Sequence, residues 1–382
     1  MTSSLDERLA EATVGALELF GVYLGTRLDL YRTLHDGGPQ RVDEFAKAAQ
    51  VDPRYAREWL EQQAVAGLIE VDDPTRPADE RRYQLPAEHV ATLLDEQHAA
   101  YVAPFAELIV GVAQSLDDVV VAYRDGTGVP YERYGPSFRQ GQGAINRPAF
   151  STDLTGTWLP AIPDVHAALC APEATIADLG CGVGWSTIAL ARAYPQAHVI
   201  GVDSDAASIS EAVGHAEQEG VNAQFVESDA AHLPRLGRFD AILLLECLHD
   251  MARPGDTLAA CRAALKEGGS VIVVDENVAS EFIAPGDLIE RMMYGWSIGH
   301  CLPASMAEQP SAALGTALRP AVVNELAANA GFAGSEIVDV DAGFFRVYRL
   351  RCRQHNAGFA PFTAPADRPP RRTATASVRP AE

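Results

Sequence analysis

The hydrophobic pattern of the first hundred residues predicts helices followed by a short hairpin. Apolar positions recur at helical spacing between residues 5 and 35, which predicts two helices that each bury one face. A short helix begins near Asp43, and a longer helix is predicted over 54–66. Two short extended runs, 68–71 and 82–85, flank a polar loop and predict a two-stranded wing. This is the order of a winged helix-turn-helix domain.

A winged helix-turn-helix domain suggests DNA binding, with the helix over 54–66 in the recognition position. The charge argues against this function, because residues 1–100 hold 10 basic and 19 acidic residues. The helix itself carries Glu58 and Glu61 beside its two arginines, so it attracts a phosphate backbone only weakly. We therefore expect the domain to serve dimerisation and to support a substrate pocket, with DNA binding as the alternative.

The second part of the chain has a different rhythm. A long helix is predicted over 98–123, and from about residue 172 short β-branched runs alternate with helical ones. This alternation predicts a parallel sheet covered by helices. Two later strands, 336–340 and 344–350, are separated by only three residues, so they must pair antiparallel. The predicted parallel strands are 175–180, 198–203, 223–227, 239–246 and 270–275.

These changes of pattern divide the chain into four parts. We expect a winged-helix-like domain over 1–97, a helical linker over 98–150 and an α/β domain over 151–352. Residues 353–382 are rich in Pro, Arg, Thr and Ala without periodicity, and they are predicted to be disordered.

Composition narrows the partners and the compartment. The 382-residue chain has a net charge of −22, so its average surface repels nucleic acid and anionic lipid headgroups. The six cysteines include no C-x-x-C pair and indicate reduced thiols in a cytosol. No leader opens the chain, and acids interrupt its longest apolar stretches. We therefore expect a cytoplasmic protein without a membrane span.

The sharpest chemical signal is a glycine-rich loop after the first parallel strand. Asp178, Gly180, Gly182 and Gly184 alternate with other residues directly before a predicted helix that begins at Trp185. Glycines let the backbone approach a ligand, and the start of a helix presents unpaired N–H groups to an anion. A dinucleotide-binding loop would have its third glycine where Trp185 stands, so NAD binding is the weaker interpretation.

Chemically useful residues also follow the next three strands. Asp203 closes the second strand, at the place of an acid that accepts hydrogen bonds from ribose hydroxyls. Asp229 and Ala230 follow the third strand, where a carboxylate can bind an adenine amino group, and Glu246 and His249 follow the fourth. Taken singly, Asp203 is as typical of a helix cap, and Asp229 of an ordinary turn. Their shared position at the ends of adjacent strands favours a ligand site.

With these motifs in order, residues 172–350 resemble the class I S-adenosylmethionine-dependent methyltransferases, whose seven-stranded Rossmann-like sheet has an antiparallel last strand. More narrowly, residues 10–350 resemble an actinobacterial methyltransferase family with a winged-helix N-terminal domain. The runs that carry this resemblance are 131–142 (YERYGPSFRQGQ), 246–251 (ECLHDM), 300–303 (HCLP) and 306–311 (MAEQPS). The resemblance implies S-adenosylmethionine as cofactor, methyl transfer as the activity and a homodimer formed through the N-terminal domain.

The resemblance also implies which residues bind the cofactor. The glycines would approach its methionine part, Asp203 would hold its ribose, and Asp229 would frame its adenine. Tyr134 and Phe138, in the segment 98–150, would cover it from the N-terminal side. The full implied set is Asp178, Gly180, Gly182, Gly184, Asp203, Asp229, Ala230, Glu246, Tyr134 and Phe138.

Methyl transfer requires a base only if the acceptor must lose a proton. His249 is the candidate base, since the ordinary pKa of histidine, near 6.5, suits proton removal around neutrality. The segment Leu248–Asp250 is similar to that of winged-helix small-molecule O-methyltransferases, whose histidine is the catalytic base. Related methyltransferases without a base also carry a histidine near this place, so both interpretations stay open. Glu246 is a candidate for an acid-base role or for a cofactor neighbour.

The segment 277–320 is where such folds build an acceptor pocket. Its soft, apolar residues predict a small, largely apolar acceptor, although each could equally pack at a domain interface. His300 and Cys301 lack metal-ligand spacing, and no metal site is predicted. The candidate pocket residues are Met292, Met293, Tyr294, Trp296, His300 and Met306.

The sequence thus predicts an enzyme that methylates a small-molecule acceptor at oxygen. The alternative is a transcriptional regulator that binds S-adenosylmethionine as a signal and DNA through its winged helix. The identity of the acceptor stays open, because apolar pockets discriminate weakly between similar substrates.

Overall fold

The structure is a computed structural model that describes residues 4–352. The tail 353–382, for which the sequence predicts disorder, lies outside the described residues. Within the described part no helix is long and apolar enough to cross a membrane.

The N-terminal region contains the predicted helices. The fourth of them shows why it begins where it does: the Asp52 carboxylate accepts hydrogen bonds from the backbone amides of Arg54 and Tyr55, and Pro53 occupies the first turn. The helices are α1 (Leu5–Arg27), α2 (Leu30–Gly37), α3 (Val42–Ala49) and α4 (Pro53–Val65).

A small hairpin and an aromatic core complete this region. Strands β1 (Glu70–Val71) and β2 (Tyr83–Gln84) pair antiparallel and confirm the predicted wing. The Trp59 ring stacks on Phe45 at 5.9 Å between centroids and meets Tyr31 edge-on at 5.1 Å. The order predicted from the sequence, helices followed by a two-stranded wing, is therefore confirmed.

The connecting region differs from its prediction in one boundary. A continuous helix from residue 98 was wrong, because α6 begins only at Phe105, after a proline that disfavours helical backbone in the residue before it. Gly126, with φ of 77°, ends this helix. The helices of this region are α5 (Val90–Leu93), α6 (Phe105–Asp125), α7 (Gly135–Asp153) and α8 (Pro163–Leu169).

The α/β region is built on a seven-stranded sheet with the order β5-β4-β3-β6-β7-β9-β8. Strand β9 runs antiparallel to both its neighbours and the other pairs are parallel, which confirms the predicted class of fold. The strands are β3 (Thr175–Leu179), β4 (His198–Asp203), β5 (Gln224–Glu227), β6 (Phe239–Leu245), β7 (Leu265–Glu276), β8 (Phe332–Ile337) and β9 (Phe345–Cys352). The predicted start of β8 at residue 336 was wrong, because a bulge extends the strand back to Phe332.

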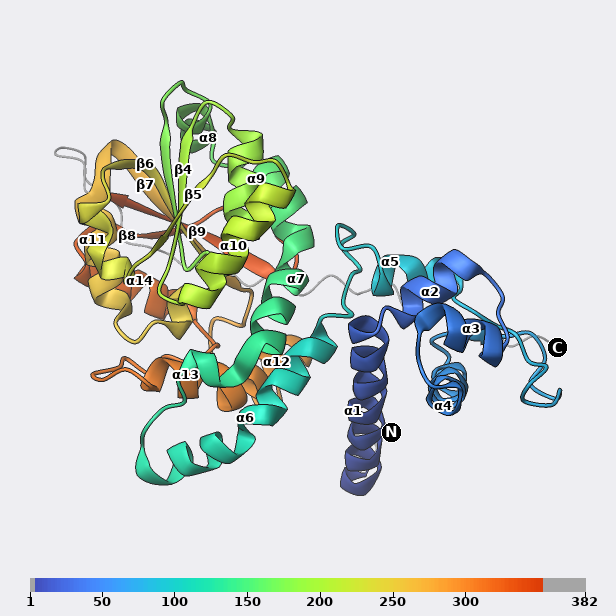
Figure 1. The fold of residues 1–382 in the computed structure, drawn as a ribbon. Helices are drawn as coiled ribbons and strands as arrows, with labels where there is room; N and C mark the ends of the chain where they lie inside the picture. Colours follow the sequence, from blue (N-terminus) through green and yellow to red (C-terminus); the bar gives the residue numbers. More distant parts are fainter. Residues whose placement is uncertain (1–3, 353–382) are drawn as a thin grey trace. The chain divides into compact units, whose positions relative to one another are not determined.

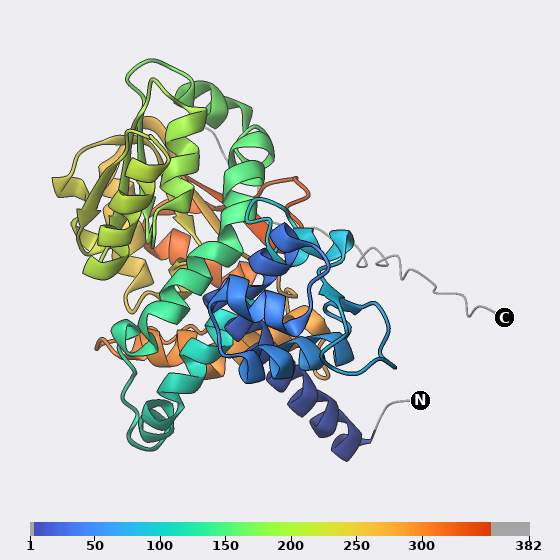
Figure 2. The ribbon, with the colours of Figure 1, turned by 45° about the vertical axis from the view of Figure 1, so that its right-hand side comes forward.

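Helices cover both faces of this sheet (Figures 1 and 2). In β7, Val271 and Val273 pack toward α11 and α14, while Ile272 and Val274 pack toward α7, α8 and α9. A strand buried on both faces has no polar side to alternate with, which explains its continuous apolar run. The covering helices are α9 (Trp185–Ala193), α10 (Ala206–Gln218), α11 (Pro254–Ala264) and α14 (Pro320–Asn329).

The connection between β7 and α14 carries α12 (Leu288–Trp296) and α13 (Leu302–Met306). A buried ion pair holds it, since the Arg319 guanidinium lies 3.1 Å from the Glu290 carboxylate and also donates to the backbone oxygen of Glu281. The segment that the sequence predicts as an acceptor pocket is therefore fixed to the α/β region at one end.

Candidate functional site

A cavity of about 1240 Å³ opens at the carboxyl ends of the parallel strands. It lies where β3 has β4 on one side and β6 on the other, which is the point where open parallel sheets bind ligands. The cavity is lined by the glycine loop after β3 and by residues after β4, β5 and β6. The fold thus brings together the four segments that the sequence singled out.

The glycine loop needs its glycines for two different reasons. Gly180, Gly182 and Gly184 all have positive φ, between 51° and 89°, which side chains rarely adopt. A Cβ at Gly180 would lie 2.7 Å from the Cβ of Cys247, so that position also has no room. A Cβ at Gly182 would meet nothing within 4 Å, so its backbone faces open space in the cavity.

Asp178 stands behind the loop and is not among the residues that line the cavity. Its carboxylate accepts hydrogen bonds from the hydroxyls of Ser186 and Thr187, at 2.6 and 2.5 Å, in the first turn of α9. Burial raises the pKa of Asp178 to about 6. The side chain therefore holds the loop against the helix rather than meeting a ligand.

Asp203 lines the cavity at the end of β4. One carboxylate oxygen accepts from the Gly182 amide at 2.8 Å, and the other accepts from the Asp205 amide at 2.8 Å. Each oxygen keeps one lone pair for a further donor, as hydroxyl recognition requires. Burial raises the pKa of Asp203, and these backbone hydrogen bonds oppose the rise. The role of helix cap, which the sequence left open for Asp203, belongs to Asp205 instead. Its carboxylate accepts a hydrogen bond from the Ser208 amide.

Asp229 and Ala230 also line the cavity, after β5. The Asp229 carboxylate caps the following turn by accepting from the Ala231 amide at 2.8 Å, and it lies 3.3 Å from the Arg253 guanidinium. Asp229 therefore stabilises a turn, as the sequence allowed, and it lines the cavity as well.

Helix α7 lies directly against the glycine loop. A Cβ at Gly143 would lie 2.2 Å from a methyl carbon of Val183, so no side chain fits between helix and loop. Arg139, one turn earlier, donates to the Glu211 carboxylate at 2.9 Å and so ties α7 to α10. Residues of the segment 98–150 thus form one wall of the cavity.

Glu246 links α7 to the end of β6. It has a left-handed backbone, with φ of 51°, and its carboxylate accepts from the side-chain amides of Asn146 and Gln142. Burial raises the pKa of Glu246 to about 7. Sequence reasoning missed Asn146, although two amides four residues apart on one helix face were a usable signal.

His249 occupies the turn after β6 and is 3% exposed. Its Nδ1 donates to the Asp275 carboxylate at 2.9 Å, which leaves Nε2 on the cavity side, 3.3 Å from Asp250 Oδ1. Burial alone would lower the pKa of His249, but the carboxylates of Asp275, Asp250 and Glu276 outweigh it and raise the pKa well above its ordinary value. Sequence reasoning missed Asp275, because the partner lies on β7 and no local pattern marks it.

An aromatic cluster forms the wall opposite the strand ends. Phe138 lines the cavity and stacks on the His300 ring at 3.9 Å between centroids. Tyr134 does not line the cavity; it is buried behind Phe138 and donates to the backbone oxygen of Gly299 at 3.1 Å. Burial lowers the pKa of His300 to about 4, so its ring is neutral near pH 7.

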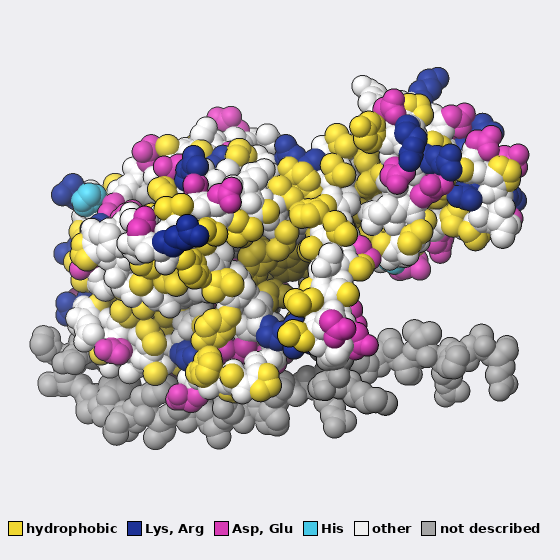
Figure 3. All heavy atoms as spheres, turned by 90° about the horizontal axis from the view of Figure 1, so that it is seen from below, with side chains coloured by type: hydrophobic (Ala, Val, Ile, Leu, Met, Phe, Trp, Pro, Cys, Tyr) yellow, Lys and Arg dark blue, Asp and Glu magenta, His cyan; other side chains and the backbone are white. Residues whose placement is uncertain are grey.

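Like Phe138 and Tyr134, the residues predicted to form the acceptor pocket divide into those that line the cavity and those that do not. Met292, Met293, Trp296 and His300 line the cavity, joined by Phe105 from α6, whose ring stacks on Trp296. Tyr294 and Met306 are not among the lining residues. Figure 3 shows hydrophobic side chains gathered around a hollow on the face seen from below. One end of the cavity is thus polar and the other is mainly apolar.

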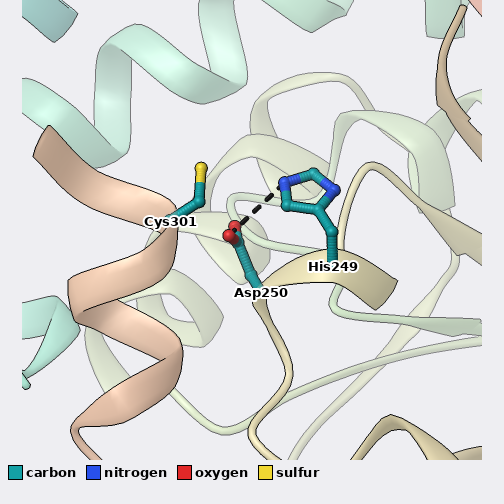
Figure 4. Close-up of side chains that lie close together, drawn as sticks. All are labelled: His249, Asp250 and Cys301. Carbon is teal, nitrogen blue, oxygen red and sulfur yellow. Dashed lines mark ion pairs between the residues drawn. The ribbon is translucent and has the colours of Figure 1, made fainter. Parts of the chain in front are cut away.

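The fold also assembles two groups of metal-ligating side chains that no local spacing reveals. One consists of His249, Asp250 and Cys301, and the other of His249, Asp275 and Glu276. Figure 4 shows the first group, with the Asp250 carboxylate between the Cys301 thiol and the His249 ring. Burial raises the pKa of Cys301 to about 12, so this thiol carries its proton.

Comparison with known proteins finds a family match in each half of the chain. Residues 176–269 match a family described as a methyltransferase domain, and residues 15–94 match the Rv2258c-like winged HTH domain. A ubiquinone biosynthesis O-methyltransferase of Cereibacter sphaeroides is 37% identical over 110 residues, which are 28% of this chain and 44% of the relative. The match therefore spans less than half of that relative's length.

Solved structures show that the similarity of fold extends over nearly the whole chain. Human N-acetylserotonin methyltransferase, in complex with S-adenosylmethionine, covers 92% of this chain and is covered to 99%, with a TM-score of 0.66 and 17% identity. PigF with S-adenosylhomocysteine gives a TM-score of 0.68 at 16% identity, covering 92% of this chain and 100% of its own. At such identities the similarity shows the fold, here a class I methyltransferase sheet with a helical N-terminal domain.

Proposed function

We propose that this chain, which combines a winged helix-turn-helix domain with a class I methyltransferase domain, transfers a methyl group from S-adenosylmethionine to a hydroxyl of a small, largely apolar acceptor. One observation carries the proposal: the glycine loop, Asp203 and His249 line the same cavity. The similarity to methyltransferases in both sequence and fold supports it.

The residues present fit this cofactor. The open backbone at Gly182 gives room for its methionine part, and the two free lone pairs of Asp203 suit the ribose hydroxyls. Asp229 and Ala230 would frame the adenine, while Glu246 would neighbour the methionine end. Asp178 supports the loop from behind, and Tyr134 supports Phe138, so we assign these two an indirect role.

The charge of the cavity fits the cofactor as well. S-adenosylmethionine supplies an electrophilic methyl group on a positively charged sulfur. Asp203, Asp205 and Asp250 line the cavity, while Arg139 and Arg253, its two arginines, are both paired with acids. A cavity of negative potential attracts a cation and disfavours an acceptor that carries a carboxylate or phosphate.

His249 is the group that we assign to deprotonation of the acceptor. Its Nδ1–H is held by Asp275, so the ring orientation is fixed and Nε2 is the nitrogen that accepts the hydroxyl proton. Because the neighbouring carboxylates raise the pKa of His249, Nε2 must first release a proton to solvent, and it is then a strong base. The carboxylate of Asp275 then stabilises the imidazolium that results. The rest of the task is positioning, because in-line transfer needs the acceptor oxygen about 3 to 3.5 Å from the methyl carbon in a site free of water.

The two alternative functions receive less support from the structure. On α4, Arg54 pairs with Glu58 and Arg57 pairs with Glu61, so the arginines available for a phosphate backbone are already neutralised. Trp185 occupies the place of the third glycine of a dinucleotide loop and stacks on His215 at 4.4 Å. No observation in the described part of the chain favours the regulator or the oxidoreductase.

We also propose that the protein is a homodimer and that α1 forms part of the interface. Six apolar residues of α1 and the adjoining Leu28 are at least 40% exposed, more than a monomer surface ordinarily presents in one place. Such a surface is stable when a second copy covers it. The exposed residues are Leu5, Leu9, Val14, Leu17, Phe20, Leu24 and Leu28.

We place the protein in the cytoplasm on the state of its cysteines. All six lie within the described residues and all six are free thiols. Free thiols persist in a reducing compartment.

Calorimetric titration of S-adenosylhomocysteine into the wild-type chain and into Asp203→Ala tests the central proposal. We expect wild-type binding that the substitution weakens tenfold or more, about 1.4 kcal/mol. The matched control is Glu336→Ala, which removes an acid 58% exposed on the edge strand β8 and should leave binding unchanged. Absence of binding to the wild type would overturn the assignment and direct the work to nicotinamide cofactors and DNA.

A further inference from the structure

Three donor atoms of different kinds meet where the polar and the mainly apolar ends of the cavity join. His249 and Asp250 come from the turn after β6, and Cys301 comes from the segment between α12 and α13. One nitrogen, one carboxylate oxygen and one sulfur of these residues all lie within 4.8 Å of one another. All three residues line the cavity (Figure 4).

The histidine of this group is prepared for coordination. Its Nδ1 donates to Asp275, which is fully buried, so Nε2 is left as the nitrogen that faces Asp250 at 3.3 Å. A histidine that binds a metal through one nitrogen almost always donates its other N–H to a carboxylate or carbonyl in this way. The Asp275 contact therefore supplies the outer support that such a site needs.

The Asp250 oxygen that faces the histidine lacks a hydrogen-bond donor in the described part of the chain. Asp250 Oδ1 is inaccessible to solvent and accepts no hydrogen bond among the described residues, although His249 Nε2 lies 3.3 Å away. A buried acceptor without a donor costs about 1 to 3 kcal/mol. A cation between the two atoms removes this cost.

The spacing of the donors suits a tetrahedral ion. Zinc binds nitrogen and oxygen at about 2.0 to 2.2 Å and sulfur at about 2.3 Å, so its tetrahedral ligands lie about 3.3 to 3.8 Å apart. The 3.3 Å between Nε2 and Oδ1 is already in this range, and the limit of 4.8 Å for the group requires small side-chain movements only. Thiolate and imidazole ligands favour zinc-like ions over magnesium or calcium.

The second group, His249, Asp275 and Glu276, is a poorer candidate. Binding there would break the hydrogen bond from Nδ1 to Asp275. Asp275 is also fully buried and is not among the residues that line the cavity. In the first group all three residues line the cavity.

We propose that His249 Nε2, Asp250 and Cys301 bind one zinc-class divalent cation, which takes the place where an acceptor hydroxyl would meet Nε2 and so blocks methyl transfer. Cys301 coordinates as the thiolate and His249 through a deprotonated Nε2, and both protons leave to solvent. The binding site is independent of the proposed function, whereas the block of activity rests on it.

The first experiment measures binding on the full chain without cofactor or acceptor. Zinc is titrated against a chromophoric chelator, and cobalt is added separately to report sulfur ligation through its thiolate charge-transfer absorption. We expect one equivalent of zinc per chain, at least tenfold weaker binding in Asp250→Asn and in Cys301→Ser, and loss of the charge-transfer band in Cys301→Ser. Thermal unfolding of each metal-free variant shows that it has folded.

Cys170→Ser is the matched control, because Cys170 is an exposed thiol whose sulfur lies 3.8 Å from His166 Nε2. It should bind zinc and cobalt as the wild type does. The proposal is overturned if the wild type binds no stoichiometric zinc, if the charge-transfer band survives in Cys301→Ser, or if Cys170→Ser loses the metal instead.

The second experiment measures methyl transfer with an acceptor found by screening metal-free protein. Zinc at one equivalent should lower the rate at least tenfold in the wild type and in Cys170→Ser, and excess chelator should restore it. Full activity of the zinc-loaded wild type would overturn the block. Failure of the metal-free protein to methylate any acceptor would count against the proposed function and leave the binding result standing.

Discussion

The two ends of the cavity differ in what lines them, which is mainly backbone at one end and side chains at the other. The end that we assign to the cofactor consists largely of backbone at strand ends, held in left-handed conformations at Gly180, Gly182 and Gly184. The end that we assign to the acceptor consists of side chains from α6, α12 and the residues around His300. Backbone geometry tolerates few substitutions, whereas apolar side chains can be exchanged for others of similar volume. Changes at the first end should therefore act on binding and folding, and changes at the second on the choice of acceptor.

His249→Ala should have the largest effect, because His249 lies where the two ends meet. Proton transfer by a positioned group contributes about 10²- to 10⁴-fold, so kcat should fall by that factor. Calorimetry should show S-adenosylhomocysteine affinity unchanged within about threefold, since the assigned cofactor contacts lie elsewhere. His198→Ala is the control, because that ring is 69% exposed at the opposite end of β4. A loss of kcat below threefold would leave methyl transfer without a base.

Asp178→Asn tests whether the cofactor end is held from behind. The pKa of Asp178 is raised by burial to about 6, from 3.8, so the folded state keeps a proton that the unfolded chain releases. This stabilisation is complete below pH 3.8 and is lost as the pH rises to about 6, at most about 3 kcal/mol for a shift of this size. The free energy of unfolding of the wild type should therefore fall over this window relative to that of Asp178→Asn. Parallel pH profiles of the two proteins from urea unfolding would contradict the prediction.

A pair of alanine substitutions should separate folding from binding within the glycine loop. Gly180→Ala combines a left-handed backbone, a strain of about 1 to 2 kcal/mol, with a collision against Cys247, so it should mainly lower the free energy of unfolding. Gly182→Ala has the same kind of strain but projects a methyl group into free space, so it should mainly weaken S-adenosylhomocysteine binding. Urea unfolding and calorimetry measure the two effects. Equal losses in both variants would remove the distinction between the two glycines.

Met292→Leu should have the smallest effect and sharpen the contrast from the acceptor side. Leucine nearly conserves the volume of methionine, and such exchanges usually cost less than about 1.5 kcal/mol. We expect the KM of the acceptor to change by less than about tenfold, with kcat and cofactor affinity unchanged. Steady-state kinetics with each substrate varied in turn measure this. A change in cofactor affinity would show that the two ends are not independent.

The same contrast explains what could be predicted from the sequence. The glycine loop and Asp203 act within a few residues of the structure they start, so their pattern predicts their place. Asp275 and Asn146 meet His249 and Glu246 only through tertiary packing; no local signal marks Asp275, and the spacing of Gln142 and Asn146 does not name their partner. The start of α6 was missed because helical spacing continues upstream of Phe105, where Pro104 overrides it. The domain boundaries at residues 97 and 150 stay predictions.

The contact between Gly143 and Val183 determines where this chain can be joined to a segment of a related protein in a chimaera. The two family matches, 15–94 and 176–269, leave α7 unclaimed, yet α7 is the helix whose Gly143 lies directly against the Val183 side chain of the glycine loop. A chimaera joined near residue 95 keeps helix and loop from one parent, whereas a junction near residue 155 places a foreign helix on the loop. Any residue but glycine at the facing position would then push the two apart by the width of a methyl group. The exchangeable module is therefore the winged helix alone, and the covering helix must be inherited with the catalytic half.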